Sequence, residues 1–264
     1  MVPEIEESPM RITWLSHSGF LVEAIDAVLV FDMFQDPAKT VEEFFLSRHG
    51  SSVPPAPVYF FVSHSHADHC SPEILRYAEE SNVAYVLETE AARSLLEGDR
   101  QGLRLPERAV VRMKPGDAAD FGSMKVHAFG STDQGVSFLV QLDGHWVFHA
   151  GDLNDWYWES ESTEKELAED EAAFDRIVAD LAATLSGSNP AVLSVAFLPL
   201  DPRLGRHADR GALRFLDAIP AHTIVPMHLP PKTALPGLLA LATIGRAEVI
   251  ELDGSGAFID IEFP

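Results

Sequence analysis

The stretch Phe61-Val62-Ser63-His64-Ser65-His66-Ala67-Asp68-His69-Cys70 decides the fold of this chain. It continues from Val58–Val62, an uninterrupted apolar run that predicts a short strand buried on both faces. Because residues two apart in an extended chain point to the same side, His64 and His66 can present their imidazoles together. Side chains at the end of a buried strand are held by a rigid scaffold, which favours a functional site here.

A turn near Ala67 would direct Asp68 and His69 toward a second point close to the first. Imidazole nitrogen together with carboxylate oxygen suits Zn²⁺, Mn²⁺ or Fe²⁺ much better than Mg²⁺ or Ca²⁺. The stretch therefore predicts a site for one or two such ions, although the same residues also fit a solvated polar loop. We favour the metal site, because three histidines and one aspartate rarely fall together by composition alone.

Strand-like and helix-like segments alternate in both halves of the chain, with hairpins between them. Asp143-Gly144 is a strong hairpin signal between two apolar runs. Ser71-Pro72 supplies a cap and a first-turn proline for a helix that continues to about Ser81. Thr163 opens the clearest helix, and Glu166 completes its capping box. The alternation predicts an α/β fold in which helices cover stacked sheets.

The composition excludes several classes of partner. Lys plus Arg is 19 and Asp plus Glu is 41, which gives a net charge of −22 over 264 residues. A surface this acidic repels nucleic-acid backbones and anionic membranes, so we expect a small-molecule substrate, no nucleic acid and no membrane. The hydrophobic fraction of 46% can fill a sizeable core, and no linker is evident, so residues 1–264 are expected to form a single domain. The sequence leaves a homo-oligomer open.

Cysteine content and the N-terminal residues bear on the compartment. Cys70 is the only cysteine, so no intrachain disulfide can form. The acidic residues 1–9 lack the basic and apolar regions of a signal peptide, and no apolar run approaches the roughly 18 residues that span a bilayer. We therefore expect a cytoplasmic protein.

His64-x-His66-x-Asp68-His69 after a hydrophobic strand resembles the signature of the metallo-β-lactamase superfamily of metal-dependent hydrolases. The resemblance extends along nearly the whole chain. Residues that match further family positions are Asp32 after the strand 28–31, Asp152 in His149-Ala150-Gly151-Asp152, and His228 in Val225-Pro226-Met227-His228. Trp14-Leu15-Ser16-His17-Ser18-Gly19-Phe20 resembles the opening of the branch that contains the ascorbate-phosphate lactonase.

This resemblance implies a four-layered αβ/βα sandwich of the metallo-β-lactamase type, with a site for two ions at one edge between the sheets. The implied ligands are His64 and His66 for one ion and Asp68, His69 and His228 for the other. Asp152 would bridge the two ions, which would also share a water or hydroxide. Asp32 would accept a hydrogen bond from a ligand histidine and so fix the tautomer of that histidine.

The sequence departs from the family at the third histidine of the first ion. Where that histidine is expected, the chain reads Gly130-Ser131-Thr132-Asp133-Gln134-Gly135. We predict that Asp133 takes its place, and His127 is the ligand if the register differs. The first ion site can also be weak, which leaves a mononuclear centre open.

Four residues are candidates for the surroundings of the ions, namely His17, Trp156, Arg203 and His207. His17 either lines the site or is a hydrogen-bonded histidine in a strand turn. Trp156 either walls a substrate pocket or covers the site and packs the long helix. Arg203 and His207 belong to a basic stretch that could attract an anionic substrate or pair with neighbouring acids.

Three functions fit this set of residues. The first is hydrolysis of a small-molecule ester, lactone or phosphodiester, in which a metal-bound hydroxide attacks and Asp68 or Asp152 assists proton transfer. The second is a metal-binding domain without turnover, a sensor or interaction module, which the missing third histidine motivates. The third is redox chemistry at a di-iron site, which we rank below the others because that branch normally pairs with a flavin-binding domain.

Overall fold

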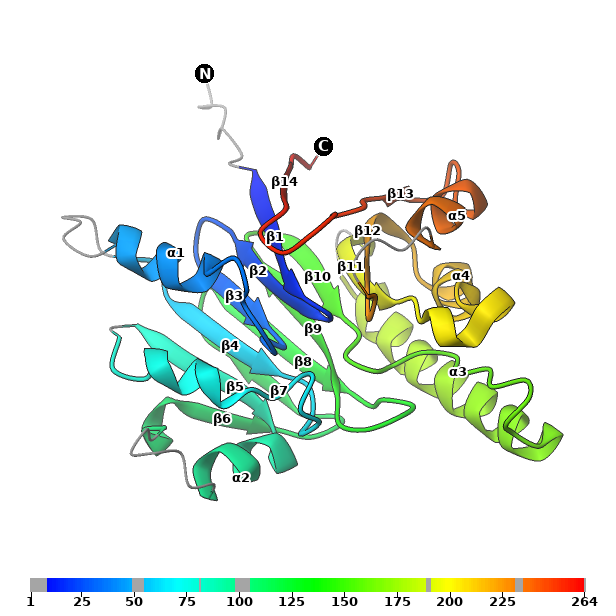
Figure 1. Cartoon of the computed structure of the whole chain (residues 1–264), viewed down its shortest axis with the longest axis horizontal. Coiled ribbons are helices and arrows are strands. Elements are labelled where there is room, and N and C mark those ends of the chain that lie inside the picture. Colours follow the sequence, from blue (N-terminus) through cyan, green and yellow to red (C-terminus); the bar gives the residue numbers. More distant parts are fainter. Residues whose placement is uncertain are drawn as a thin grey trace.

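The computed structural model describes residues 9–48, 55–80, 82–97, 105–188, 191–230 and 235–263. These residues contain two seven-stranded sheets that face each other (Figure 1). The first sheet consists, in spatial order, of β14 (Phe258–Ile261), β1 (Met10–Ser16), β2 (Gly19–Glu23), β3 (Val28–Phe31), β4 (Val58–Val62), β5 (Val83–Glu88) and β6 (Val110–Met113). The second consists of β13 (Glu248–Val249), β12 (Ala221–Met227), β11 (Leu193–Pro199), β10 (His145–His149), β9 (Ser137–Leu142), β8 (Met124–Phe129) and β7 (Ala118–Asp120).

Helices cover the outer face of each sheet (Figure 1). The first sheet is covered by α1 (Thr40–Arg48) and α2 (Thr89–Glu97), and the second by α3 (Glu164–Ser186), α4 (Arg210–Ala218) and α5 (Leu235–Ala242). Short 3₁₀ helices are η1 (Pro72–Tyr77), η2 (Glu107–Ala109) and η3 (Pro202–His207). The layers are therefore helix, sheet, sheet and helix, and the predicted four-layered α/β sandwich is confirmed.

Strand β4 shows why an uninterrupted apolar run suits a central strand. Tyr59 and Phe61 point into the core between the sheets, where the ring of Phe61 lies 5.2 Å from that of Phe138 on the opposite sheet. Val58, Phe60 and Val62 point the other way, into the core beneath α1 and α2. Both faces of the strand are buried, as predicted, and the strand places its carboxyl end at the edge between the two sheets.

Local signals in the sequence specify several elements. Thr163 and Glu166 form the predicted capping box at the start of α3. Asp143-Gly144 joins β9 and β10 as an antiparallel hairpin, also as predicted. The predicted helix to about Ser81 is wrong in type and length, because η1 is a 3₁₀ helix that ends at Tyr77. Its three-residue repeat puts Ile74 and Tyr77 on one buried face.

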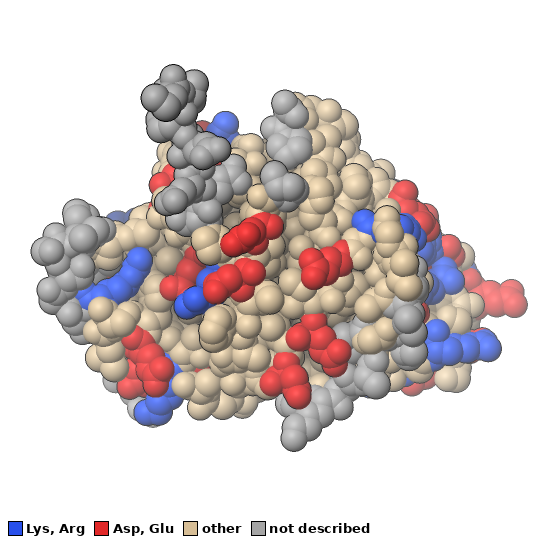
Figure 2. All heavy atoms as spheres, turned by 90° about the horizontal axis from the view of Figure 1, so that it is seen from above, with Lys and Arg blue, Asp and Glu red and all other residues tan. Residues whose placement is uncertain are grey.

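The surface charges include both isolated side chains and ion pairs. The face in Figure 2 shows separate acidic and basic side chains set in a mostly uncharged surface. Between α3 and α4, Arg214 pairs with Asp155, Glu171 and Asp175 at 2.6 to 2.8 Å. Within the described ranges, no helix is both long and apolar enough to cross a membrane.

Candidate metal centre

The candidate ligands come together at the edge where strands of both sheets end. Asp32 follows β3, and His64 to His69 follow β4, which is parallel to β3. Asp152 follows β10 and His228 follows β12, and both strands are parallel to β11. Because parallel strands end at the same edge of a sheet, segments distant in sequence deliver polar side chains to one place.

Two groups of ligand atoms form at this edge. The first group is His64, His66 and Asp152, and the second is His17, Asp68, His69 and His228. In each group, one ligand atom per residue lies within 4.8 Å of all the others. The structure therefore places His17 in the second group. It also brings together the six residues that the sequence predicts as metal ligands, which are His64, His66, Asp68, His69, Asp152 and His228.

Asp152 lies between the two groups. Its Oδ2 lies 3.4 Å from Nε2 of His64 in the first group. Its Oδ1 lies 3.2 Å from Nε2 of His69 and 3.8 Å from Nε2 of His228 in the second. The side chain is buried, so the carboxylate faces the two groups rather than solvent. This is the position that a carboxylate shared by two cations would occupy.

A buried network orients the histidines. Asp32 accepts hydrogen bonds from Nδ1 of His69 at 2.7 Å and from the hydroxyl of Ser63 at 2.6 Å. Because the Ser63 hydroxyl gives its proton to Asp32, it accepts from Nδ1 of His64, 2.9 Å away. Both histidines are therefore protonated on Nδ1 and turn Nε2 toward the ligand groups, as metal-binding histidines do.

A metal ion fits the donors that are left over. Nε2 of His69 and Oδ1 of Asp152 are buried, and neither has a hydrogen-bond partner among the residues that the structure describes, since their 3.2 Å approach lacks hydrogen-bond geometry. Orphaned polar atoms of this kind are costly in a protein interior unless something binds them. Imidazole nitrogens with carboxylate oxygens are the donors that Zn²⁺, Mn²⁺ and Fe²⁺ take, so the residues fit the ion that the sequence predicts.

The electrostatics of the site follow from burial and from the paired charges. Burial alone would lower the pKa of His69, but Asp32 and Asp152 outweigh it and raise the pKa to about 10. Burial alone would raise the pKa of Asp152, yet His69, His228 and His64 hold it below its usual value. Burial, together with His228 and His69, lowers the pKa of His17 to about 4. The two buried carboxylates therefore favour positive charge at this point of the site.

The segment 130–135, where a third histidine was expected, approaches His64 through its backbone. Gly135 has φ +77, and a Cβ there would lie 2.1 Å from the carbonyl oxygen of Ser63 and 2.5 Å from Cβ of His64. Asp133 lies at the exposed rim of the site, and His127 lies on β8 with its ring 6.4 Å from that of Trp146. Among the described residues, neither belongs to a group of candidate ligands.

A cavity of about 390 Å³ opens over the ligands. Its floor is formed by His66, Asp68, Asp152 and His228, and its walls by Thr132, Asp133, Trp156, Trp158, Asp170 and Arg203. The Trp156 indole donates a hydrogen bond to the carbonyl of Asp152 at 3.0 Å and stacks in parallel on Trp158. Trp156 therefore both walls the cavity and supports the segment that carries Asp152.

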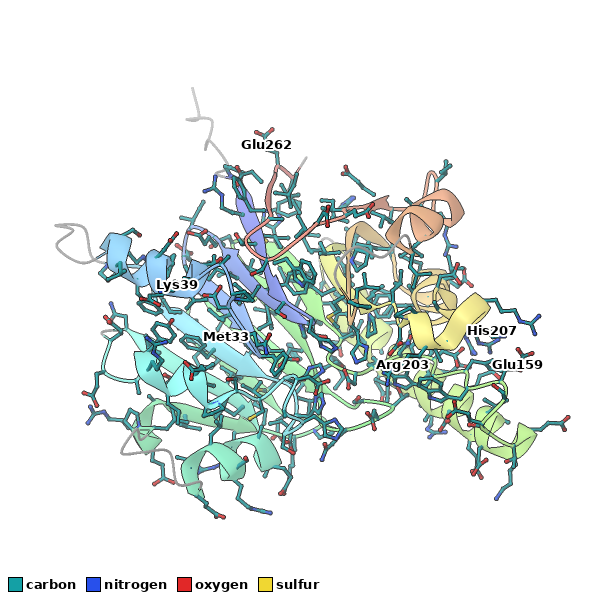
Figure 3. All side chains as sticks on the ribbon, in the orientation of Figure 1. Met33, Lys39, Glu159, Arg203, His207 and Glu262 are labelled. Carbon is teal, nitrogen blue, oxygen red and sulfur yellow. The ribbon has the colours of Figure 1, made fainter. Side chains whose placement is uncertain are left out.

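The basic residues of the segment 203–214 lie partly at the cavity and partly on the surface away from it. Arg203 lines the cavity beside the ring of Trp158. His207 does not line it and instead lies 3.4 Å from Glu159, farther from the strand ends than Arg203 (Figure 3). Arg206 also pairs with Glu159, and Arg210 and Arg214 pair with Asp155. Of these predicted residues, only Arg203 is in a place to meet a molecule in the cavity.

Sequence reasoning missed Asp201 and Ser63. Asp201 is 2% exposed and lies 3.1 Å from Nδ1 of His228, as an ion-pair partner of that histidine, and Asp32 has a similar place beside His69. Arg203 pairs with the same carboxylate. Burial alone would raise the pKa of Asp201, but His228 and Arg203 hold it below its usual value. The available signal was its position shortly after the end of a buried strand, which Asp32 and Asp152 share.

Known proteins with similar sequences are metal-dependent hydrolases by name. The family model described as "Beta-lactamase superfamily domain" matches residues 25–229. A protein of Desulforamulus reducens named "UPF0173 metal-dependent hydrolase" is 31% identical over 159 residues, which are 54% of this chain and 62% of that protein. A protein of the same name from Archaeoglobus fulgidus is 30% identical over 163 residues, 55% of this chain and 62% of that protein. The match thus spans less than two thirds of either relative.

Solved structures share the fold at low sequence identity. Igni18, a metallo hydrolase from Ignicoccus hospitalis, superimposes with a TM-score of 0.62 and 19% identity over 97% of this chain and 100% of that one. CmlA, a diiron beta-hydroxylase from Streptomyces venezuelae, gives 0.60 and 13% over 97% of this chain and 54% of that one. With the family model matching residues 25–229, this chain belongs to the metallo-β-lactamase superfamily.

Proposed function

We propose that this protein is a metal-dependent hydrolase of a small-molecule ester, lactone or phosphodiester. The observation that carries the proposal is the meeting of two ligand groups at Asp152 on the floor of a cavity large enough for a small substrate. The names of the two sequence relatives support hydrolysis, and the resemblance of Trp14–Phe20 to a lactonase branch favours a lactone.

Two sets of side chains would hold one or two ions, namely His64, His66 and Asp152, and Asp68, His69 and His228. Bound Zn²⁺, Mn²⁺ or Fe²⁺ supplies Lewis acidity at the scissile bond and makes water a stronger acid. Asp32 and Ser63 hold the ligand histidines in the tautomer that binds a cation.

The remaining roles belong to the cavity. Asp68 is about half exposed and lines the cavity, so its carboxylate can accept a proton from attacking water and return it to the leaving group. Asp152 turns both oxygens toward the ligand groups, so its part is to hold the site together. Trp156 and Trp158 shield the bond from bulk water, and the exposed Arg203 can pair with an anionic part of the substrate.

The test is a hydrolysis screen of the purified protein, loaded separately with Zn²⁺, Mn²⁺ and Fe²⁺, on lactones, phosphodiesters, esters and thioesters. We expect turnover of at least one class, and its loss in His66→Ala and Asp152→Ala. His222→Ala is the control, because His222 is an exposed histidine on β12 outside both ligand groups. Turnover that survives both ligand substitutions would contradict the proposal.

A metal-binding domain without turnover is the second candidate. It is favoured by the exposed position of Asp133, which leaves the first group with two histidines and the shared Asp152. Stoichiometric metal binding in a protein that hydrolyses nothing in the screen would favour this candidate over the hydrolase.

A further inference from the structure

His17 occupies a strained position in the turn between β1 and β2. Its φ is +53, in the left-handed region that glycine or asparagine adopts most easily. The turn is fixed by Trp14, whose indole donates to the carbonyl of His17 at 3.1 Å, and by Gly19, which packs against the carbonyl oxygen of Asp32. A histidine held in such a conformation indicates a role for its side chain.

The imidazole of His17 faces the second ligand group. Its Nε2 lies 3.9 Å from Oδ2 of Asp68, and its ring centroid lies 4.3 Å from that of His228 and 5.3 Å from that of His69. The buried hydroxyl of Ser18 lies 3.1 Å from Nδ1, which leaves Nε2 free toward the group. The side chain is 23% exposed, so most of the imidazole is covered by its neighbours.

We propose that His17 is a ligand of the metal ion bound by Asp68, His69 and His228. Apart from Asp152, which lies between the two groups, this ion then has three histidines and Asp68, whereas the other has two histidines. The segment 130–135 supplies no histidine to the first group, and the β1–β2 turn supplies one to the second. The second group is therefore the tighter site and fills first. The inference rests on the metal centre of the proposed function but does not require hydrolysis.

The experiment is a titration of the chelator-treated chain of 264 residues with Co²⁺, in which calorimetry and visible absorption report the binding. We expect the wild-type protein to bind the first equivalent tightly. His17→Asn and His17→Gly, which both suit a positive φ, should weaken that first equivalent by at least about tenfold and change the Co²⁺ absorption bands. His222→Ala should leave both measurements unchanged, because His222 is exposed and distant from the groups.

Several results would overturn the inference. If His17 only contacts substrate or only shapes the turn, the folded variants bind Co²⁺ with wild-type affinity and an unaltered spectrum. If the wild-type chain binds no Co²⁺, the inference and the proposed metal centre fail together. If the protein hydrolyses nothing but its Co²⁺ spectrum depends on His17, the proposed function is contradicted and the ligand role of His17 is supported. The glycine variant also relieves the backbone strain, so loss of folding cannot hide the answer.

Discussion

Asp201 and His228 are 3.1 Å apart, carboxylate oxygen to Nδ1, and this contact mirrors the 2.7 Å hydrogen bond between Asp32 and His69. Because a carboxylate can only accept, the Asp32 hydrogen bond keeps the proton of His69 on Nδ1, and the nearby charge of Asp201 favours a proton on Nδ1 of His228; both leave Nε2 for the ligand group. The two carboxylates come from different sheets, Asp32 after β3 and Asp201 after β11. Each sheet thus orients its own histidine toward the shared edge.

Replacing Asp201 should weaken metal binding without removing a ligand. Asp201→Asn keeps the size of the side chain and can still accept from the backbone N–H of Arg203, so the fold should persist. It removes the charge that fixes the tautomer of His228, and we expect metal affinity to fall by about 10- to 100-fold. Calorimetric titration with Zn²⁺ measures this directly. Wild-type affinity in the variant would show that Asp201 serves only to cap η3.

Asp133 should prove dispensable for metal binding. It is exposed and lies outside both ligand groups, so Asp133→Ala should change Zn²⁺ affinity by no more than about twofold. Asp152→Ala is the matched comparison and should weaken binding at both groups, since both contact that carboxylate. A large loss of affinity in Asp133→Ala would mean that the segment 130–135 closes onto the ion when it binds.

Gly135 should be among the positions least tolerant of substitution. A Cβ there would clash with the backbone of Ser63 and with His64, and φ is +77, so Gly135→Ala should cost at least about 2 kcal/mol of unfolding free energy. Gly144 has φ +82 and open space around it, so Gly144→Ala should cost only about 1 kcal/mol. Urea denaturation of both variants measures the difference. Equal losses would rule out the clash as the dominant cause.

The free energy of unfolding at alkaline pH should depend on the ionisation of Tyr77. Burial raises the pKa of Tyr77 to about 12, despite the opposing charge of Arg76. Because the folded-state value exceeds the unfolded-state value of 10.0, the contribution of this group to stability is complete below pH 10 and is lost as the pH rises to about 12.

Tyr77→Phe removes this titration and keeps the stacking on Phe45 and Phe60. We expect equal stability of the two proteins at pH 8, and an advantage of up to about 1 kcal/mol for the variant at pH 11. Chemical denaturation at the two pH values gives the comparison. An advantage that is already present at pH 8 would point to packing instead of ionisation.

The fold could be predicted where neighbouring residues carry the information. The capping box at Thr163 and the hairpin at Asp143-Gly144 depend on residues a few positions apart, and both form as expected. The sequence gives no clear signal for the start of α1 at Thr40, because the residue that caps this helix lies four positions earlier. The carboxylate of Asp36 accepts from the N–H groups of Thr40 and Val41, and no polar cap directly precedes an apolar periodic segment.

The sequence by itself determined the α/β alternation and the cluster from His64 to His69, because residues that share one strand end are placed by the local backbone. The family resemblance named Asp32, Asp152 and His228 as well, but only the tertiary structure decided how the distant side chains meet at the site. It brought Asp201 to His228 and His17 to Asp68, and it left Asp133 at the rim. Those distances depend on how the two sheets pack and on which turns reach their common edge, and no local pattern of residues encodes them.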